Sequence, residues 1–161
     1  METASSGIIQ GVQSSGVSPN RFCIMTAAQT ILVVDDHVNL ARAFAMALEH
    51  EGYVVHTAHT AEDGLRLAQT EHPAAIILDL RMPFINGTGF LYRLREYPQH
   101  TDTPVMVVTG ESVNEEMRAD LTELRAVLRF KPLGMAQLLA EVVALLGNPP
   151  GTTSTAHRLV S

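Results

Sequence analysis

Four strand-like stretches of this 161-residue chain each run into a polar side chain at their carboxyl end. Three of them, 31–34, 74–78 and 105–108, are short and apolar, which is typical of strands buried on both faces of a sheet. The carboxyl ends of parallel strands share one edge of a sheet, and ligands bind at that edge. We therefore expect one site to collect these polar side chains, which are Asp35, Asp36, Asp79, Thr109 and Lys131.

Strand patterns alternate with helix patterns along the chain. Apolar residues recur at helical spacing after the first strand, as Phe44 and Leu48 do before the stop signal Gly52. Five strand–helix units predict an α/β fold with a parallel sheet and helices on both faces. The expected strands cover 30–35, 53–58, 74–79, 104–109 and 126–130, and the last two helices cover about 112–124 and 133–146.

The composition changes at both ends of this pattern. Residues 1–29 are rich in Ser, Gly, Thr and Gln without a sustained period, and residues 148–161 begin with Asn-Pro-Pro-Gly. We therefore expect a folded domain over 30–147, with a flexible N-terminal arm over 1–29 and a flexible C-terminal tail over 148–161.

The charge and the apolar pattern exclude several classes of partner. With 11 basic and 17 acidic residues, the net charge of −6 gives no reason to expect binding to nucleic acid or to an anionic membrane. No apolar run approaches the roughly 18 residues that a membrane span requires, so no membrane insertion is expected. The single cysteine, Cys23, cannot form an internal disulfide. Together these features predict a soluble, cytoplasmic protein.

The polar residues at the strand ends suggest a specific chemistry. Asp35, Asp36 and Asp79 would form a cluster of negative charge that requires a cation. Oxygen ligands without a nearby cysteine favour Mg²⁺ or Mn²⁺ over zinc. A carboxylate can attack phosphorus to form an acyl phosphate, and Asp79 is the candidate nucleophile. The ammonium of Lys131 and the hydroxyl of Thr109 are suited to hold phosphoryl oxygens.

Taken singly, each of these features has a simpler explanation. An acid pair after a strand is often a helix N-terminal cap, and Lys131-Pro132 alone is a sharp turn that a cis peptide bond would allow. Their occurrence in this order, each at a strand end, makes coincidence a poor explanation.

In these residues the chain resembles the receiver domain of the two-component response-regulator family, in the form of a single-domain response regulator. The resemblance covers residues 30–147 and so spans the expected folded domain. It is carried by Ile31-Leu32-Val33-Val34-Asp35-Asp36, Leu78-Asp79-Leu80-Arg81-Met82-Pro83 with Gly87, Val107-Val108-Thr109-Gly110, and Lys131-Pro132.

The resemblance implies a flavodoxin-like, doubly wound sheet of five parallel strands in the order 2-1-3-4-5. It implies that Asp79 takes a phosphoryl group from a sensor histidine kinase or a histidine phosphotransfer protein in a Mg²⁺-dependent reaction. Thr109 and Lys131 would bind the phosphoryl oxygens, and output would pass through contacts with a downstream protein. The implied metal ligands are Asp36, Asp79 and the backbone carbonyl of Arg81, with Asp35 acting through water.

Some positions depart from the family pattern. Leu128 stands three positions before the lysine, where the family usually has an aromatic residue whose rotamer couples to the Thr. Leu124-Arg125 stands where a Gly-Ala pair commonly precedes the fifth strand. Arg81 and Glu111 each lie two residues beyond a site residue, and they are either an ion pair that limits the access of water or two solvated side chains.

The histidines are scattered. His37 follows the acid pair and could sit near the site, but an exposed residue at a helix start is the preferred interpretation. His56 and His59 are interpreted as solvated.

Three functions remain open. The first is a stand-alone phosphoacceptor switch, not an enzyme beyond its own phosphorylation and dephosphorylation, because the tail after residue 147 is too short for a DNA-binding module. The second is an adaptor of the same fold that binds partners without phosphorylation, which Leu128 slightly favours. The third is a metal-dependent aspartyl-phosphate phosphatase. Such enzymes commonly place a second acid two residues after the nucleophile, where this chain has Arg81.

Overall fold

The computed structural model of the chain describes residues 28–147 and contains a five-stranded parallel sheet. Its strand order is β2-β1-β3-β4-β5, as the resemblance implies. The consecutive strands β2 and β3 lie on opposite sides of β1. The strand order therefore reverses between β1 and β3, and ligands bind at such a switch point in sheets of this kind. The strands are β1 (Thr30–Val34), β2 (Val54–Ala58), β3 (Ala75–Asp79), β4 (Val105–Thr109) and β5 (Ala126–Phe130).

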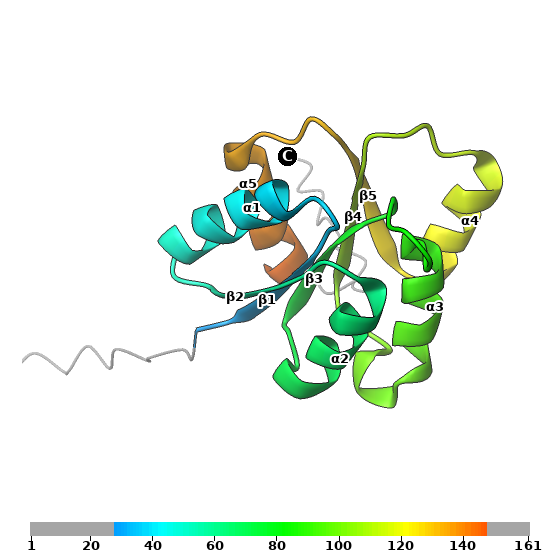
Figure 1. Ribbon diagram of the computed structural model, residues 1–161, viewed down its shortest axis with the longest axis horizontal. Coiled ribbons are helices and arrows are strands. Elements are labelled where there is room, and N and C mark those ends of the chain that lie inside the picture. The colour runs from blue at the N-terminus through cyan, green and yellow to red at the C-terminus, as the bar shows by residue number, and fades with distance from the viewer. Residues whose placement is uncertain (1–27, 148–161) are drawn as a thin grey trace, which may run out of the picture.

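Helices cover both faces of the sheet (Figure 1). The helices α1 and α5 lie on one face, and α2, α3 and α4 lie on the other (Figure 1). Successive side chains of β1 point to opposite faces of the sheet. Ile31 and Val33 pack into the core under α1 and α5, and Leu32 and Val34 pack into the core under α2, α3 and α4. The helices are α1 (Val38–His50), α2 (Ala61–Glu71), α3 (Gly87–Glu96), α4 (Glu115–Glu123) and α5 (Met135–Gly147).

Local side chains set where the helices begin and end. Thr60 accepts a hydrogen bond from the Asp63 N–H at the start of α2, as the sequence suggests. Gly52, with a φ of +93°, follows the end of α1 and adopts a backbone conformation that favours glycine. The helix α4 begins at Glu115 and not at 112, because Asn114 caps it by accepting from the Met117 N–H.

Two further differences from the expected elements have local causes. The last helix begins at Met135 rather than 133, because Leu133 lies before the helix as part of the core under α1 and α5. A short 3-10 helix, Pro98–His100, follows α3 and was not expected.

Gly87 brings the start of α3 against the end of β3. A Cβ at this position would lie 2.7 Å from the Leu80 Cα and 2.8 Å from the Asp79 carbonyl oxygen. The Gly87 N–H donates to the Leu80 carbonyl at 3.0 Å. This close approach fixes the loop that follows Asp79, and that loop forms one wall of the site.

The proposed flexible arm lies outside the described residues except for residues 28 and 29, and the proposed tail lies wholly outside them. The boundaries of the domain therefore remain a prediction. Among the helices of residues 28–147, none combines the length and apolar character needed to cross a membrane.

Candidate functional site

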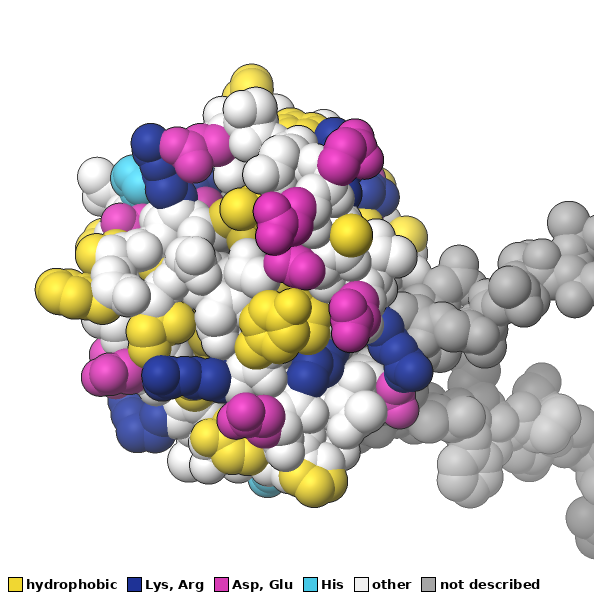
Figure 2. Space-filling view, turned by 90° about the vertical axis from the view of Figure 1, so that its right-hand side faces the viewer, with side chains coloured by type: hydrophobic (Ala, Val, Ile, Leu, Met, Phe, Trp, Pro, Cys, Tyr) yellow, Lys and Arg dark blue, Asp and Glu magenta, His cyan; other side chains and the backbone are white. Residues whose placement is uncertain are grey.

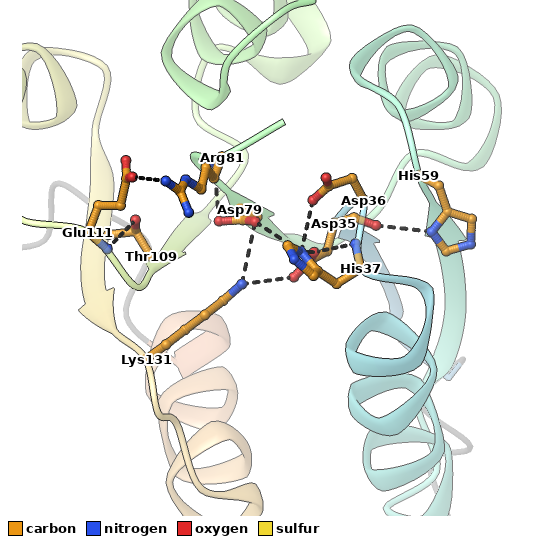
Figure 3. A network of polar contacts seen from close by, with 9 residues as sticks. All are labelled: Asp35, Asp36, His37, His59, Asp79, Arg81, Thr109, Glu111 and Lys131. Carbon is orange, nitrogen blue, oxygen red and sulfur yellow. Dashed lines mark hydrogen bonds and ion pairs between the residues drawn. The ribbon is translucent and has the colours of Figure 1, made fainter. Parts of the chain in front are cut away.

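The expected polar residues meet at one edge of the sheet, as the strand-end pattern predicts (Figure 3). Asp35 and Asp36 follow β1, Asp79 ends β3, Thr109 ends β4 and Lys131 follows β5. Asp79 and Lys131 open onto a cavity of about 290 Å³, which is also lined by His37, Leu40, Arg81, Gly110 and Glu111. Thr109 lines an adjacent cavity that shares Arg81 and Glu111 with the first.

Asp35 is held by the protein through both of its carboxylate oxygens. Its Oδ1 accepts from the His37 backbone N–H at 2.8 Å, and its Oδ2 accepts from the Lys131 ammonium at 3.2 Å. The residue is 3% exposed. His37 is the N-cap residue of α1 and makes no side-chain cap bond, so the acid pair shapes the turn before the helix rather than capping it.

Asp36 and Asp79 each keep one carboxylate oxygen without a hydrogen-bond donor. Within residues 28–147, Asp36 Oδ1 and Asp79 Oδ2 are buried and accept no hydrogen bond. Asp79 is itself 3% exposed. A buried anionic oxygen without a donor is unfavourable unless a cation satisfies it. The donor set therefore fits a hard divalent cation at this acidic cluster.

Burial raises the pKa of the Asp79 carboxyl above its ordinary value, and the nearby charge of Asp35 acts in the same direction. The Arg81 N–H, which donates to Asp79 Oδ1 at 3.2 Å, and the Lys131 ammonium both lower this pKa and only partly offset the burial. A bound cation would favour the charged form that a nucleophilic carboxylate needs.

The ammonium of Lys131 lies between two carboxylates. Its Nζ is 3.2 Å from Asp35 Oδ2 and 3.4 Å from Asp79 Oδ2 (Figure 3). The Lys131-Pro132 peptide bond is cis, which agrees with the sharp turn expected there. The side chain is thus directed at the oxygen of Asp79 that accepts no hydrogen bond.

Thr109 lies at the wall of the site opposite the acid pair. It is 1% exposed, and its Oγ1 accepts from the Glu111 backbone N–H at 3.2 Å. Its hydroxyl hydrogen remains available for an oxygen in the cavity. Leu128, the departure from the family pattern, is partly buried on β5 and packs against the core on the α2, α3 and α4 face.

Arg81 and Glu111 form an ion pair between the loops that follow β3 and β4 (Figure 3). This confirms the paired alternative over two separate solvated side chains. The pair joins two walls of the cavity. The expected role of the Arg81 carbonyl as a metal ligand remains a prediction.

His37 is the exposed residue at a helix start that the sequence predicts, because its side chain is 61% exposed and it is the N-cap residue of α1. It also lies at the site, since its Nδ1 is 2.9 Å from Asp36 Oδ1 and 3.1 Å from Asp35 Oδ1. The interpretation of His56 and His59 as solvated was wrong. His59 is not simply solvated, because its Nδ1 lies 3.0 Å from the Asp35 carbonyl oxygen. His56 is partly buried, and its Nε2 lies 3.4 Å from Glu71 Oε2. The place of His37 directly after the acid pair was the available signal, because the bend that turns the two acids inward also carries this ring.

The response regulator receiver domain family has a model that matches residues 31–143 of this chain. The chain belongs to this family. Receiver domains are the phosphoacceptor signalling domains of two-component response regulators, and they bind Mg²⁺ at an acidic pocket. They interact with histidine kinases or phosphotransfer proteins. The acidic cluster at the strand ends corresponds to such a pocket.

Individual relatives agree with this assignment. The response regulator ArlR of Staphylococcus aureus is 36% identical over 120 residues, which cover 74% of this chain and 53% of that protein. The chain thus spans about half the length of the curated relatives it matches.

Solved structures of receiver domains have the same fold. The chemotaxis protein CheY4 of Vibrio cholerae has a TM-score of 0.70 and 28% identity, covering 74% of this chain and all of that one (100%). A CheY-like receiver domain protein from Methanospirillum hungatei JF-1 has a TM-score of 0.70 and 26% identity, covering 75% of this chain and 95% of that one.

Proposed function

We propose that this protein is a phosphoacceptor switch of a two-component system in which Asp79 receives the phosphoryl group. The observation that carries the proposal is the state of Asp79 Oδ2. This oxygen is buried, accepts no hydrogen bond within the described residues, and lies 3.4 Å from the Lys131 ammonium at a cavity open to a donor. Such an oxygen is suited to attack phosphorus.

The transfer exchanges one bond to phosphorus for another. Asp79 Oδ2 forms the new O–P bond as the N–P bond of a phosphohistidine breaks. The donor histidine carries a proton on its other ring nitrogen and therefore leaves as neutral imidazole. Lys131 neutralises charge on the phosphoryl oxygens, and the Thr109 hydroxyl donates to one of them.

Asp36 and Asp79 would hold Mg²⁺ or Mn²⁺ directly, together with the Arg81 carbonyl. Asp35 would act through water, because both of its oxygens are already engaged by the protein. The ion would supply charge neutralisation and would bring the incoming phosphate close to a cluster of carboxylates that otherwise repels it.

The donor is a sensor histidine kinase or a histidine phosphotransfer protein. We propose that it docks over the cavity and the first turns of α1, including Asn39 and Arg42. A groove of about 500 Å³ between α1 and β2 is lined in part by Arg42 and by the exposed apolar residues Val38 and Met46, which supports this location. As is general for response regulators, we place this exchange in the cytoplasm.

Output would pass through contacts with a downstream protein and not through DNA. The net charge of −6 supports this proposal. On the face that carries α3 and α4, basic side chains alternate with acidic ones (Figure 2). Leu128 favours the adaptor only slightly, and the complete set of Asp79, Thr109 and Lys131 argues against it. A phosphatase of this kind would carry a second acid at position 81, where this chain has an arginine that pairs with Glu111.

The test is chemical labelling with a small phosphodonor. The whole chain is incubated with Mg²⁺ and acetyl phosphate, and the modified peptide is mapped by mass spectrometry. We expect one added phosphoryl group on Asp79, loss of labelling in Asp79→Asn, and wild-type labelling in the control Asp102→Asn. Asp102 is an exposed acid that pairs with Arg125 outside this cavity. Full labelling of Asp79→Asn would remove the assignment.

A further inference from the structure

The imidazole of His37 enters the acidic cluster, although the sequence assigned it no part in binding (Figure 3). Its Nδ1 lies 2.9 Å from Asp36 Oδ1, 3.1 Å from Asp35 Oδ1 and 3.9 Å from Asp79 Oδ2. One ligand atom from each of these four residues fits within a group whose members all lie within 4.8 Å of one another. The ring nitrogen and the carboxylates thus face a common space.

Hydrogen bonding accounts for only part of this arrangement. Nδ1 is within hydrogen-bond geometry of Asp35 Oδ1, but its 2.9 Å approach to Asp36 Oδ1 lacks that geometry. Across the part of the chain that the structure describes, Asp36 Oδ1 and Asp79 Oδ2 accept no hydrogen bond and are shielded from solvent. Two buried carboxylate oxygens therefore lie 2.9 Å and 3.9 Å from a ring nitrogen without a hydrogen bond to it, and oxygen and nitrogen atoms placed in this way are suited to hold a cation.

An imidazole nitrogen changes which ion such a site prefers. Carboxylate, carbonyl and water ligands suit Mg²⁺ and Mn²⁺, whereas imidazole suits later first-row ions such as Co²⁺, Ni²⁺ and Zn²⁺. The neutral tautomer with its proton on Nε2 presents a lone pair at Nδ1. Because the His37 side chain is 61% exposed, that tautomer can direct its Nε2 proton to solvent.

We propose that His37 is a nitrogen ligand of the acidic site, so that the site binds divalent later transition ions through one imidazole and the carboxylates of Asp36 and Asp79. In the metal-free protein, Nδ1–H donates to Asp35 Oδ1. Binding of the ion selects the other tautomer and replaces that contact. The inference rests on the metal site of the proposed function and adds to it a residue and a class of ion.

His59 provides a matched control. Its ring also lies next to the acid pair, but its Nδ1 is 3.0 Å from the Asp35 carbonyl oxygen and it does not belong to the group of converging ligand atoms. Removing either imidazole deletes one histidine near Asp35, whereas only the His37 ring faces Asp36 and Asp79.

The experiment measures Co²⁺ and Mg²⁺ binding by calorimetry and Co²⁺ absorption, with the whole chain, no histidine tag and a fixed neutral pH. The wild type, His37→Ala and His59→Ala are compared. We expect His37→Ala to lower the affinity for Co²⁺ relative to that for Mg²⁺ by about tenfold or more, because a nitrogen ligand is lost. His59→Ala should leave this ratio within about threefold of wild type.

A second readout does not depend on a variant. In wild-type protein, substoichiometric Co²⁺ should shift or broaden the NMR signals of the His37 ring more strongly than those of the His59 ring. An unchanged Co²⁺-to-Mg²⁺ ratio in His37→Ala, or tighter binding of both ions in that variant, would overturn the proposal. Labelling of wild-type Asp79 by acetyl phosphate is measured separately, so failure of the His37 ligand and failure of the phosphoacceptor are distinguishable.

Discussion

Burial makes the ionised form of Asp79 unfavourable. The carboxyl is 3% exposed and lies beside another acid, so its pKa is raised by burial first and by Asp35 as a smaller contribution. A carboxyl that binds protons more tightly in the folded state than in the unfolded state lowers folded stability as pH rises from its unfolded pKa through its folded pKa. At neutral pH in the absence of a cation, the ionised Asp79 therefore destabilises the fold.

Removing this charge is expected to stabilise the metal-free protein. In EDTA at pH 7.5, Asp79→Asn should raise the free energy of unfolding and therefore the Tm, because the substitution removes a buried charge. The gain should shrink as pH falls toward the unfolded pKa of about 3.9, because protonation removes the buried charge from the wild type as well. Thermal unfolding at pH 7.5 and pH 4.5 measures this. A variant less stable than wild type at pH 7.5 would contradict the argument.

Asp35 and Asp36 differ in the hydrogen bonds that their carboxylates already accept. Both oxygens of Asp35 accept hydrogen bonds from the protein, whereas Asp36 Oδ1 accepts none among the described residues. We therefore expect Asp36→Ala to weaken Mg²⁺ binding by about tenfold or more, and Asp35→Ala to weaken it less. Titration of Mg²⁺ at fixed pH compares the two variants. Wild-type affinity in Asp36→Ala would refute the direct ligand.

At the scale of the elements, Gly87 tests whether close packing positions the site. Alanine in the first turn of a helix is favoured over glycine by roughly 0.5–1 kcal/mol, so propensity predicts that Gly87→Ala stabilises α3. Its Cβ, however, would lie 2.7 Å from backbone at Leu80, and overpacking of this kind typically destabilises by about 1–3 kcal/mol. The two effects differ in sign.

We expect the packing effect to dominate. Gly87→Ala should unfold at lower denaturant concentration than wild type and bind Mg²⁺ more weakly, because the loop after Asp79 must move. Gly134→Ala is the control, since a Cβ there meets nothing within 4 Å, and its stability should change by less than about 1 kcal/mol. If Gly87→Ala were as stable as wild type or more stable, the loop after Asp79 could move to accept the Cβ at little cost in free energy.

The elements themselves could be predicted from local patterns. All five strands and five helices appear in the expected order, because strands buried on both faces and amphipathic helices leave strong traces in a sequence. The predicted elements differ from the structure where tertiary contacts, or very short length, determine the local conformation. Leu133 fits a helical pattern but packs in the core before α5 begins, and the short helix Pro98–His100 has too few residues for a periodic signal.

The site could be predicted as a set of residues but not in its contacts. Parallel strands bring Asp79, Thr109 and Lys131 to one edge whatever the loops do. The position of the His37 ring depends on how the turn after β1 is hydrogen-bonded, and a residue that is mostly exposed carries no apolar pattern to reveal it.

Across the whole molecule, the site connects parts of the chain that are distant in sequence. Thr109 and Lys131 lie at opposite ends of the segment that contains α4 and β5. Leu121 is the buried residue of α4, and β5 forms an edge of the sheet with intermediate exposure along most of its length. A segment with few buried contacts is readily shifted by small changes at its two ends.

Phosphorylation should therefore alter residues 109–131 more than the rest of the domain. A phosphoryl group on Asp79 adds charge that Thr109 and Lys131 can bind, and their inward movement would displace the segment between them. Amide exchange of the whole chain, with and without Mg²⁺ and a beryllofluoride mimic, measures this. We expect changed protection along α4 and β5, including Leu128, which packs against the core and can follow the movement without an aromatic ring. Changes confined to the residues that line the cavity would favour the adaptor over the switch, because a charge that moves nothing beyond its own site cannot inform a partner bound elsewhere.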